Sequence, residues 1–423
     1  MSNGPNPPRR RVLADLSPLW RFPQFGLLWS GQLVSFAGSQ LTVVAVPYQV
    51  FRLTHSSLDV GLVSLGQLVP LLVGSLLGGA AADTFDRKRL LLATQLLMGL
   101  MSTGLALNAG RHHPALWPLF VLTAVSAGVS GADSPTRNAL ISNLVDRPTY
   151  PSAYALFQIL AQVGQVAGPA LAGILLAGFG VRTVFWVDVA TFVVSFGVVL
   201  RLRPPPRTEP ASRLRLSSVT EGLRFLRGRP ALQANFIIDI NAMVFGMPRA
   251  LFPAIGLVRF HGGARVVGLL YAAPGLGALA GSLLSGWIPS VRRQGLAVEL
   301  AVVVWGAAIT GFGLSPWLGF SLGLLALAGA ADVVSAVFRN TILQLAIPDS
   351  LRGRLSAVHI AVVTGGPRLG DVEAGVVAAA AGTEVSVVSG GLACVAGVGL
   401  LAWLVPAFTA YKGEASPEGS GPG

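Results

Sequence analysis

The sequence has few charged residues and a single cysteine. Charged side chains make up 11% of its 423 residues, whereas about a quarter of a typical soluble protein is charged. Because so few charges cannot cover a water-exposed surface, we exclude a soluble globular fold. The single cysteine, Cys394, excludes a disulfide framework and a cysteine-based metal cluster, and we expect no metal site.

Apolar residues dominate instead. They make up 52% of the chain, and the mean hydropathy is +0.66. A helix needs about 20 mainly apolar residues to cross a bilayer. Twelve such segments are separated by charges, prolines and glycines, at residues 25–51, 59–82, 90–109, 115–136, 152–178, 183–202, 231–256, 266–288, 296–313, 317–343, 355–380 and 385–410. We therefore expect an all-α membrane protein with twelve transmembrane helices.

The positions of the basic residues predict how these helices are oriented. The formal net charge is +12, and most basic residues lie in the two tails and in every second turn. Because basic residues favour the cytoplasmic side of a membrane, both termini are expected in the cytoplasm of a cell-membrane protein. The charge would face lipid headgroups, so we expect no nucleic-acid partner. The opposite loops hold only Arg52, Arg111, Arg182, Arg259 and Arg265.

A charged, proline-rich stretch divides the chain in two. Residues 203–230 hold three consecutive prolines and several arginines, which predicts a cytoplasmic linker. We expect a tail at 1–24, a six-helix bundle at 25–202, the linker at 203–230, a second six-helix bundle at 231–410 and a tail at 411–423. The Arg137-Asn138 pair recurs as Arg339-Asn340. This echo favours duplicated halves that rock around a central site.

The turn between predicted helices 2 and 3 is short and densely charged. It contains Gly79, Asp83, Asp86, Arg87 and Lys88 in the stretch GAAADTFDRKR. The cytoplasmic bias of basic residues alone accounts for Arg87 and Lys88. Asp83 needs a further explanation, since it ends a helix whose dipole is negative there. We expect Asp83 to meet a cation or the N-terminus of another helix.

Predicted helix 5 contains a ladder of small residues. Gly164, Gly168 and Gly173 are spaced by four or five residues, and Pro169 removes a backbone donor from the same helix. Glycines on one face let a neighbouring helix approach closely. Tight packing alone is one interpretation of the ladder, and a part in transport is the other.

The charged turn and the glycine ladder resemble two motifs of the major facilitator superfamily, and the resemblance extends over nearly the whole chain. It is greatest to the branch that contains the enterobactin exporter and the drug:proton antiporters. The resemblance implies the major facilitator fold, a gating role for Asp83 and Arg87, and an antiporter-type role for the ladder. Asp86 departs from the superfamily pattern, which has glycine at that place.

Several ionisable residues lie inside predicted helices, where each costs free energy and is a functional candidate. The acids exceed the arginines, and a carboxyl group out of water can bind and release protons. We expect Asp371 or Glu373 to couple protons to transport, followed by Asp239. Asp332 has a second interpretation as a structural contact with helix 4. The full set is Asp239, Arg249, Asp332, Arg368, Asp371 and Glu373.

Helix 11 is expected to break or bend, because Gly365, Gly366 and Pro367 precede Arg368. Backbone groups freed by a break need a neighbour or water to bond to, so we expect a polar cavity near residues 365–373. In a second interpretation, Arg368 and Asp371 only neutralise each other within the helix.

Asp133 and Arg137 are spaced as an (i, i+4) pair near the cytoplasmic end of helix 4. We interpret them as a structural or gate pair rather than as part of a cargo site.

These observations predict a proton-coupled secondary active exporter of a small, partly lipophilic molecule, such as a siderophore or an antibiotic. We expect a monomer that works by alternating access, with cargo and membrane lipids as partners. No cofactor is expected, and protons serve as the coupling ion. An importer of a small metabolite and a non-transporting membrane sensor are the alternatives. Since no nucleophile or paired catalytic motif accompanies the charges at depth, we do not expect an enzyme.

Overall fold

A computed structural model describes residues 15–203, 224, 226–346 and 352–412, and the described residues form helices without any strand. The first half contains α1 (Ser17–Arg21), α2 (Pro23–Thr54), α3 (Ser57–Gly66), α4 (Leu68–Thr84), α5 (Arg87–Ala109), α6 (Trp117–Leu144) and α7 (Tyr150–Arg201). The second half contains α9 (Pro230–Phe245), η1 (Arg249–Leu251), α10 (Phe252–Ala254), the π-helix η2 (Ile255–Arg259), α11 (Gly263–Leu283), η3 (Ser285–Ser290), α12 (Gln294–Leu314), α13 (Leu318–Ala346), α14 (Arg352–Ala381), α15 (Thr383–Leu404) and α16 (Pro406–Thr409).

The predicted all-α membrane architecture is confirmed. Among the described residues, nine helices are long and apolar enough to cross a membrane. One of them, α7, covers two predicted spans, since the backbone leaves the helical region at Gly180 (φ 79°, ψ 173°). The helices α6 and α14 are also long enough to span, although they are not among the nine. The count of twelve crossings stays a prediction.

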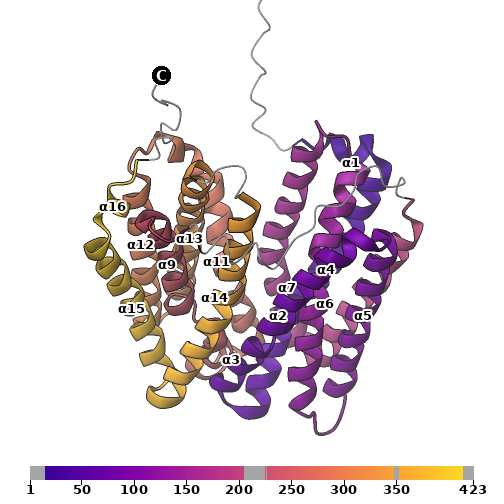
Figure 1. Ribbon diagram of the computed structural model, residues 1–423. Coiled ribbons are helices and arrows are strands. Elements are labelled where there is room, and N and C mark those ends of the chain that lie inside the picture. Colours follow the sequence, from indigo (N-terminus) through magenta and orange to yellow (C-terminus); the bar gives the residue numbers. More distant parts are fainter. Residues whose placement is uncertain (1–14, 204–223, 225, 347–351, 413–423) are drawn as a thin grey trace, which may run out of the picture.

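The helices form two bundles, one from each half of the chain (Figure 1). In the first bundle α2 packs on α7 and α4 packs on α6. In the second bundle α12 packs on α13 and α15, and α11 packs on α13. The bundles contact each other chiefly through two helix pairs, α3 with α14 and α7 with α11.

The bundles join at one end of the molecule and separate at the other. At the joined end, a single hydrophobic core combines Val63 and Val184 of the first half with Ala254 and Val267 of the second. Elsewhere each half has a core of its own. Figure 1 shows the bundles spreading apart toward α1 and α16. We term the joined end the closed end and the opposite end the open end.

The sequence predicted a break or a bend in helix 11, and α14 shows no break there. The interruption lies instead in the seventh predicted span, residues 231–256, which begins with α9 and is called helix 7 below; it is distinct from α7. Helix α14 continues through Gly365, Gly366 and Pro367. Gly366 serves close packing instead, since a Cβ there would lie 2.9 Å from Cβ of Met243. In helix 7, α9 ends at Phe245 and residues 246–248 are not helical. Pro248 lacks the backbone donor that would continue the helix.

The predicted linker at 203–230 lies largely outside the described residues, as do most of the two tails, 1–24 and 411–423. The domain boundaries at 25–202 and 231–410 therefore stay predictions.

Candidate functional site

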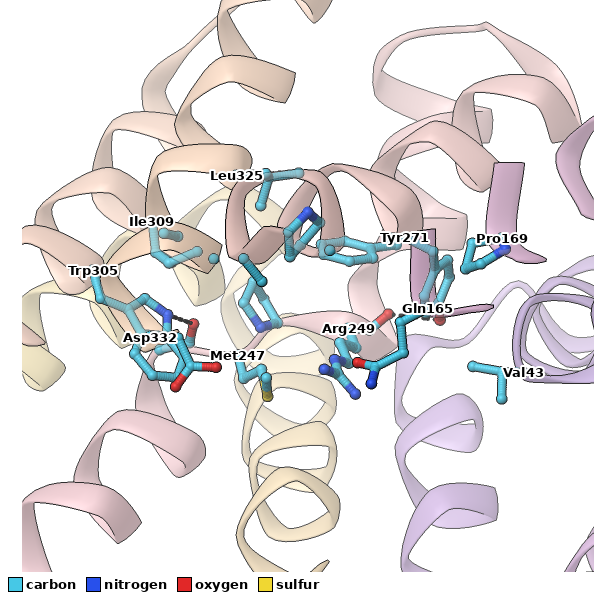
Figure 2. A pocket seen from close by; sticks show the side chains of 18 of the residues that line it. Val43, Gln165, Pro169, Met247, Arg249, Tyr271, Trp305, Ile309, Leu325 and Asp332 are labelled. Atoms are coloured by element: carbon cyan, nitrogen blue, oxygen red, sulfur yellow. Dashed lines mark hydrogen bonds between the residues drawn. The ribbon is translucent and has the colours of Figure 1, made fainter. Parts of the chain in front are cut away.

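A cavity lies between the two bundles, beside the interruption of helix 7 (Figure 2). Its volume is about 110 Å³, which is room for several water molecules. The first half contributes walls from α2 and α7. The second half contributes walls from α11, α12, α13 and the interrupted segment after α9. Non-helical backbone at membrane depth requires protein or water partners, and here it lines this cavity. The polar side chains of the lining include Gln40, Gln165, Arg249 and Asp332.

Side chains from other helices satisfy the backbone groups that the interruption frees. Trp305 of α12 donates its indole N–H to the carbonyl of Gly246 at 2.8 Å. Tyr271 of α11 donates its hydroxyl to the carbonyl of Arg249 at 3.0 Å. Because a buried, unpaired carbonyl is costly, these bonds hold the interrupted segment in one conformation and so fix where Arg249 enters the cavity.

Asp371 of α14 joins this segment to the first half. Its Oδ1 accepts from the backbone N–H of Ala250 at 3.1 Å, and its Oδ2 accepts from the hydroxyl of Ser64 in α3. The backbones are also close here, since a Cβ on Gly61 would collide with the Asp371 carbonyl. Asp371 is buried. The carboxyl group thus links the helix 7 interruption to the closed end across the boundary between halves.

Arg368, Asp371 and Glu373 of α14 are not among the residues that line the described cavity. Arg368 donates to the carbonyl of Thr364, one turn back, at 2.7 Å. Although both residues are described, Arg368 and Asp371 form no direct ion pair. Glu373 is half-buried. The described cavity borders residues 246–249 of helix 7, and none of residues 365–373 lines it.

A buried cluster of charges joins α9 and α13. Arg339 forms an ion pair with Asp239, and its second nitrogen lies 3.7 Å from Asp332. Asp332 also lines the cavity. Its ion-pair partner is thus on its own helix, α13, and not on helix 4, the contact considered from the sequence. Arg339 was not among the candidate site residues, yet it is 3% exposed.

The first half contains a related cluster around Arg137. Arg137 bonds to Asp133 at 3.1 Å and to the side-chain oxygen of Gln32 at 2.8 Å. Thr94 donates to the other Asp133 oxygen at 2.8 Å. Gln32 of α2 and Asp239 of α9 occupy equivalent positions in the two halves, because each lies the same number of residues after the proline that begins its helix. The echo of Arg137 and Arg339 in the sequence is therefore also an echo in space.

The glycine ladder of α7 contacts two different helices. Gly164 and Gly168 face α2, where added Cβ atoms would collide with Phe36 and Gln40. Gly173 faces the second half, because its added Cβ would lie 2.9 Å from Cα of Gly268 in α11. The ladder thus packs within its own bundle at one end and against the opposite bundle at the other.

Pro169, which lies between the two parts of this ladder, lines the cavity. Its carbonyl is one of the groups that an added Cβ on Gly268 would approach. The predicted motif therefore borders both the cavity and the closed end.

The charged turn between α4 and α5 is bonded within the first half. Arg87 donates to the carbonyl of Ala139 at 2.6 Å and to the side-chain oxygen of Asn143 at 2.9 Å. Lys88 donates to the carbonyl of Leu200 at 2.8 Å. These bonds join the turn to the ends of α6 and α7 at the open end. The gating role of the turn stays a prediction.

A capping role accounts for the aspartate at position 86, where the superfamily pattern has glycine. Its side chain accepts from the backbone N–H of Arg89 at 2.8 Å, which makes it the N-cap of α5. Glycine could not supply that acceptor. Gly79 is buried in α4, and the side chain of Asp83 lies outside the described residues.

The sequence analysis missed three polar residues. Asp188 of α7 is 1% exposed and accepts from the hydroxyls of Thr42 at 2.9 Å and Ser102 at 2.6 Å. Glu299 of α12 is buried and accepts from a threonine hydroxyl. The rule that selects ionisable residues inside apolar segments would have found both. Nothing in the sequence distinguishes Ser64 from other membrane serines.

Comparison with known proteins agrees with this architecture. A family model described as transmembrane secretion effector matches residues 13–418. The chain is 31% identical over 366 residues to the enterobactin exporter EntS of Citrobacter koseri, covering 86% of this chain and 87% of that protein. It is 30% identical over 359 residues to EntS of Escherichia coli O1:K1, covering 85% and 86%.

Solved transporter structures share the fold. A mutant of the nucleoside transporter NupG superposes with a TM-score of 0.73 at 13% identity, over 91% of this chain and 99% of that one. A bacterial homologue of the lysosomal transporter Spinster, inward-facing and unoccupied, gives 0.69 at 17% identity, over 93% and 97%. The family match covers nearly the whole chain, and the chain therefore belongs to the transmembrane secretion effector family of major facilitator transporters.

Proposed function

We propose that the protein is a proton-coupled exporter of a small, partly lipophilic molecule, a siderophore or an antibiotic, in the cell membrane. Similarity to the enterobactin exporters supports export. The coupling mechanism rests on two hydrogen bonds that the Asp371 carboxyl group accepts. One comes from the segment that follows the helix 7 interruption, and the other comes from α3 in the opposite half.

The orientation follows from the basic residues. Their bias toward the tails and the even-numbered turns favours a cytoplasmic location for both termini. The open end, which contains α1 and α16, then faces the cytoplasm. In this conformation cargo enters the cavity from the cytoplasm, while α3, α14, α7 and α11 close the outer side.

Burial of Asp371 supplies the coupling. When the outer side opens, α3 moves away from α14 and the carboxylate meets water. Closing that side moves the carboxyl group out of water, and an ionised carboxylate loses much more solvation free energy than a protonated one. Uptake of an external proton therefore favours closure. The proton then leaves toward the cytoplasm as cargo binds beside helix 7, so that one proton enters for each round of export.

The energy of this exchange is sufficient. A proton that moves inward across 100 mV supplies about 2.3 kcal/mol, which corresponds to a cargo gradient of nearly fiftyfold. Enterobactin and a panel of lipophilic antibiotics are the cargoes to test first.

Reconstituted vesicles with an imposed pH gradient test the proposal. We expect the gradient to drive cargo movement by the wild-type protein, and Asp371→Asn to abolish the stimulation because that side chain cannot exchange a proton. Cargo movement that responds equally to the gradient in Asp371→Asn would contradict the coupling role. Movement only in the direction of the proton flux would identify an importer instead.

Asp188→Asn is the matched control. Asp188 is also a buried acid, but it bonds only to hydroxyls within its own bundle and reaches neither the cavity nor the second half. We expect this variant to retain gradient-driven movement. Loss of stimulation in Asp188→Asn alone would move the coupling site into the first half.

A further inference from the structure

We propose that Arg249 binds an acidic group of the cargo, so that the exported molecule is a monovalent organic acid with an aromatic or apolar body. The proposal rests on the proposed transport function and specifies its substrate class. Arg249 follows the helix 7 interruption directly and lines the cavity between the bundles (Figure 2).

The guanidinium of Arg249 has no protein partner among the described residues. Other buried or half-buried arginines at depth are bonded: Arg339 pairs with two aspartates, Arg137 pairs with Asp133, and Arg368 bonds to a backbone carbonyl. A cation at membrane depth is costly unless it is paired or hydrated. An unpaired guanidinium in a small cavity is therefore a site for an anion from outside the chain.

Two carboxylates lie near Arg249 without bonding to it. Asp332 lines the same cavity, and Asp371 accepts from the backbone of the next residue, Ala250. Asp332, however, faces Arg339, and Asp371 bonds to Ser64. Figure 2 shows Arg249 and Asp332 on opposite sides of Met247. Since each acid has another partner, the five N–H donors of Arg249 stay available to the cargo.

The first half contributes two neutral polar groups to the same cavity. Gln40 of α2 and Gln165 of α7 line it, and neither side chain forms a hydrogen bond with the described residues. Figure 2 shows Gln165 and Arg249 turned toward the same part of the cavity. A carboxylate, or an ionised phenol, held by Arg249 could accept from these amides as well. An acid bound there would contact both halves.

The rest of the wall is apolar and aromatic. Phe252 and Tyr271 stack edge to face with ring centroids 5.0 Å apart, and Trp305 adds a third aromatic ring to the lining. Aromatic walls favour flat or apolar ligand bodies. Because Arg249 is the only basic residue among the lining residues, a molecule with several negative charges would be poorly matched.

Paired ligands test this inference without any membrane gradient. The full chain in lipid nanodiscs is titrated with a panel of lipophilic aromatic carboxylic acids and with the primary amide of each acid. We expect at least one acid to bind at least tenfold more tightly than its amide, a difference of about 1.4 kcal/mol. Arg249→Gln should remove that preference, and Arg249→Lys should retain part of it.

Arg368→Gln is the matched control, because Arg368 is also an arginine at depth but does not line the cavity. The acid preference should survive this substitution. The proposal is overturned if no acid binds better than its amide, or if the preference persists in Arg249→Gln. A fold defect is recognised by loss of amide binding and of the native elution profile, and Arg249→Lys then decides the case.

The binding assay and the transport assay can give independent results, so failure of the acid site is distinguishable from failure of coupled export. Acid-selective binding lost in Arg249→Gln, with no movement in vesicles, would support the ligand site and contradict coupled export. Gradient-driven movement of neutral molecules only would support export and contradict the acid site.

Discussion

The two halves of the molecule solve the same packing problem with different chemistry. In each half, an arginine bonds to a polar residue at an equivalent place on another helix of the same half. The arginine helices are α6 and α13, and their partner helices are α2 and α9. In the first half the partner is neutral Gln32, and α2 continues unbroken to Thr54. In the second half the partner is Asp239, and the helix ends at Phe245.

The difference shows where function has been added to a shared scaffold. The first half keeps its charges in local pairs and presents neutral amides to the cavity. The second half adds an interrupted helix, an arginine with no side-chain partner in the described part of the chain, and a carboxyl group that reaches across the boundary. The proposed mechanism therefore assigns cargo recognition and proton exchange mainly to the second half, and treats the first half as the surface against which the second half moves.

The largest effect should come from unpairing the buried charge of the second half. Arg339→Ala leaves Asp239 buried without a counter-charge, which destabilises by about 3–5 kcal/mol. Gln32→Ala removes only one hydrogen bond to Arg137 and should cost about 1–3 kcal/mol. Thermal unfolding of both variants in detergent measures the contrast. Equal losses of stability would show that the two clusters are energetically alike.

The closed end offers a second way to separate packing from function. In Gly173→Ala the new methyl group meets the Cα of Gly268 in the opposite half, and overpacking of this kind costs about 1–3 kcal/mol. The conformation closed at this end should lose population. Gly164→Ala crowds only Phe36 of the same bundle, so it should lower stability without favouring opening.

Distances between spin labels check this second prediction. Labels at Arg111→Cys, in the loop after α5, and at Arg265→Cys, in the first turn of α11, are exposed positions on opposite halves and report separation of the bundles at the closed end. The single native cysteine is removed as Cys394→Ser. A longer distance in Gly173→Ala but not in Gly164→Ala is expected, and an unchanged distance in both would show that the glycine contact does not control closure.

Ser64→Ala should have a smaller effect at the same boundary. It removes the hydroxyl that donates to Asp371 but leaves the bond from Ala250, so the closed end should lose about 0.5–1.5 kcal/mol. We expect faster gradient-driven transport at saturating cargo if opening limits the rate, with the coupling intact. A loss of proton coupling in this variant would show that Ser64 acts in proton transfer itself.

Asp86→Gly should have the smallest effect. It restores the superfamily residue in the turn and exchanges one tolerated N-cap for another, which costs only a few tenths of a kcal/mol. Asp86→Ala is the sharper variant, with an expected loss of about 1 kcal/mol. Thermal unfolding distinguishes them, and identical stability of all three proteins would contradict a capping role.

Much of the fold was predictable because long apolar segments allow few alternatives in a bilayer. The helix ends mostly agreed within a few residues, whereas α6 extends further than predicted, to Leu144. The site was less predictable, because a Gly and Pro run permits either a bend or close packing. Gly366 and Pro367 proved to be packing residues, while Gly246 and Pro248 interrupt a helix. Only the neighbouring helices decide between these outcomes.

Arginines at depth posed the same difficulty. Arg339 and Arg249 both lie within apolar segments, but one is paired and the other is not. The pairing depends on α9 and α13 lying side by side, which no local pattern specifies.

Proton release on cargo binding tests the central claim most directly. In weakly buffered detergent solution, saturating cargo should release protons from the wild-type protein, since cargo beside helix 7 and the proton on Asp371 exclude each other. Asp371→Asn should bind cargo without releasing protons, and Asp188→Asn should release them normally. Undiminished release from Asp371→Asn would contradict the account.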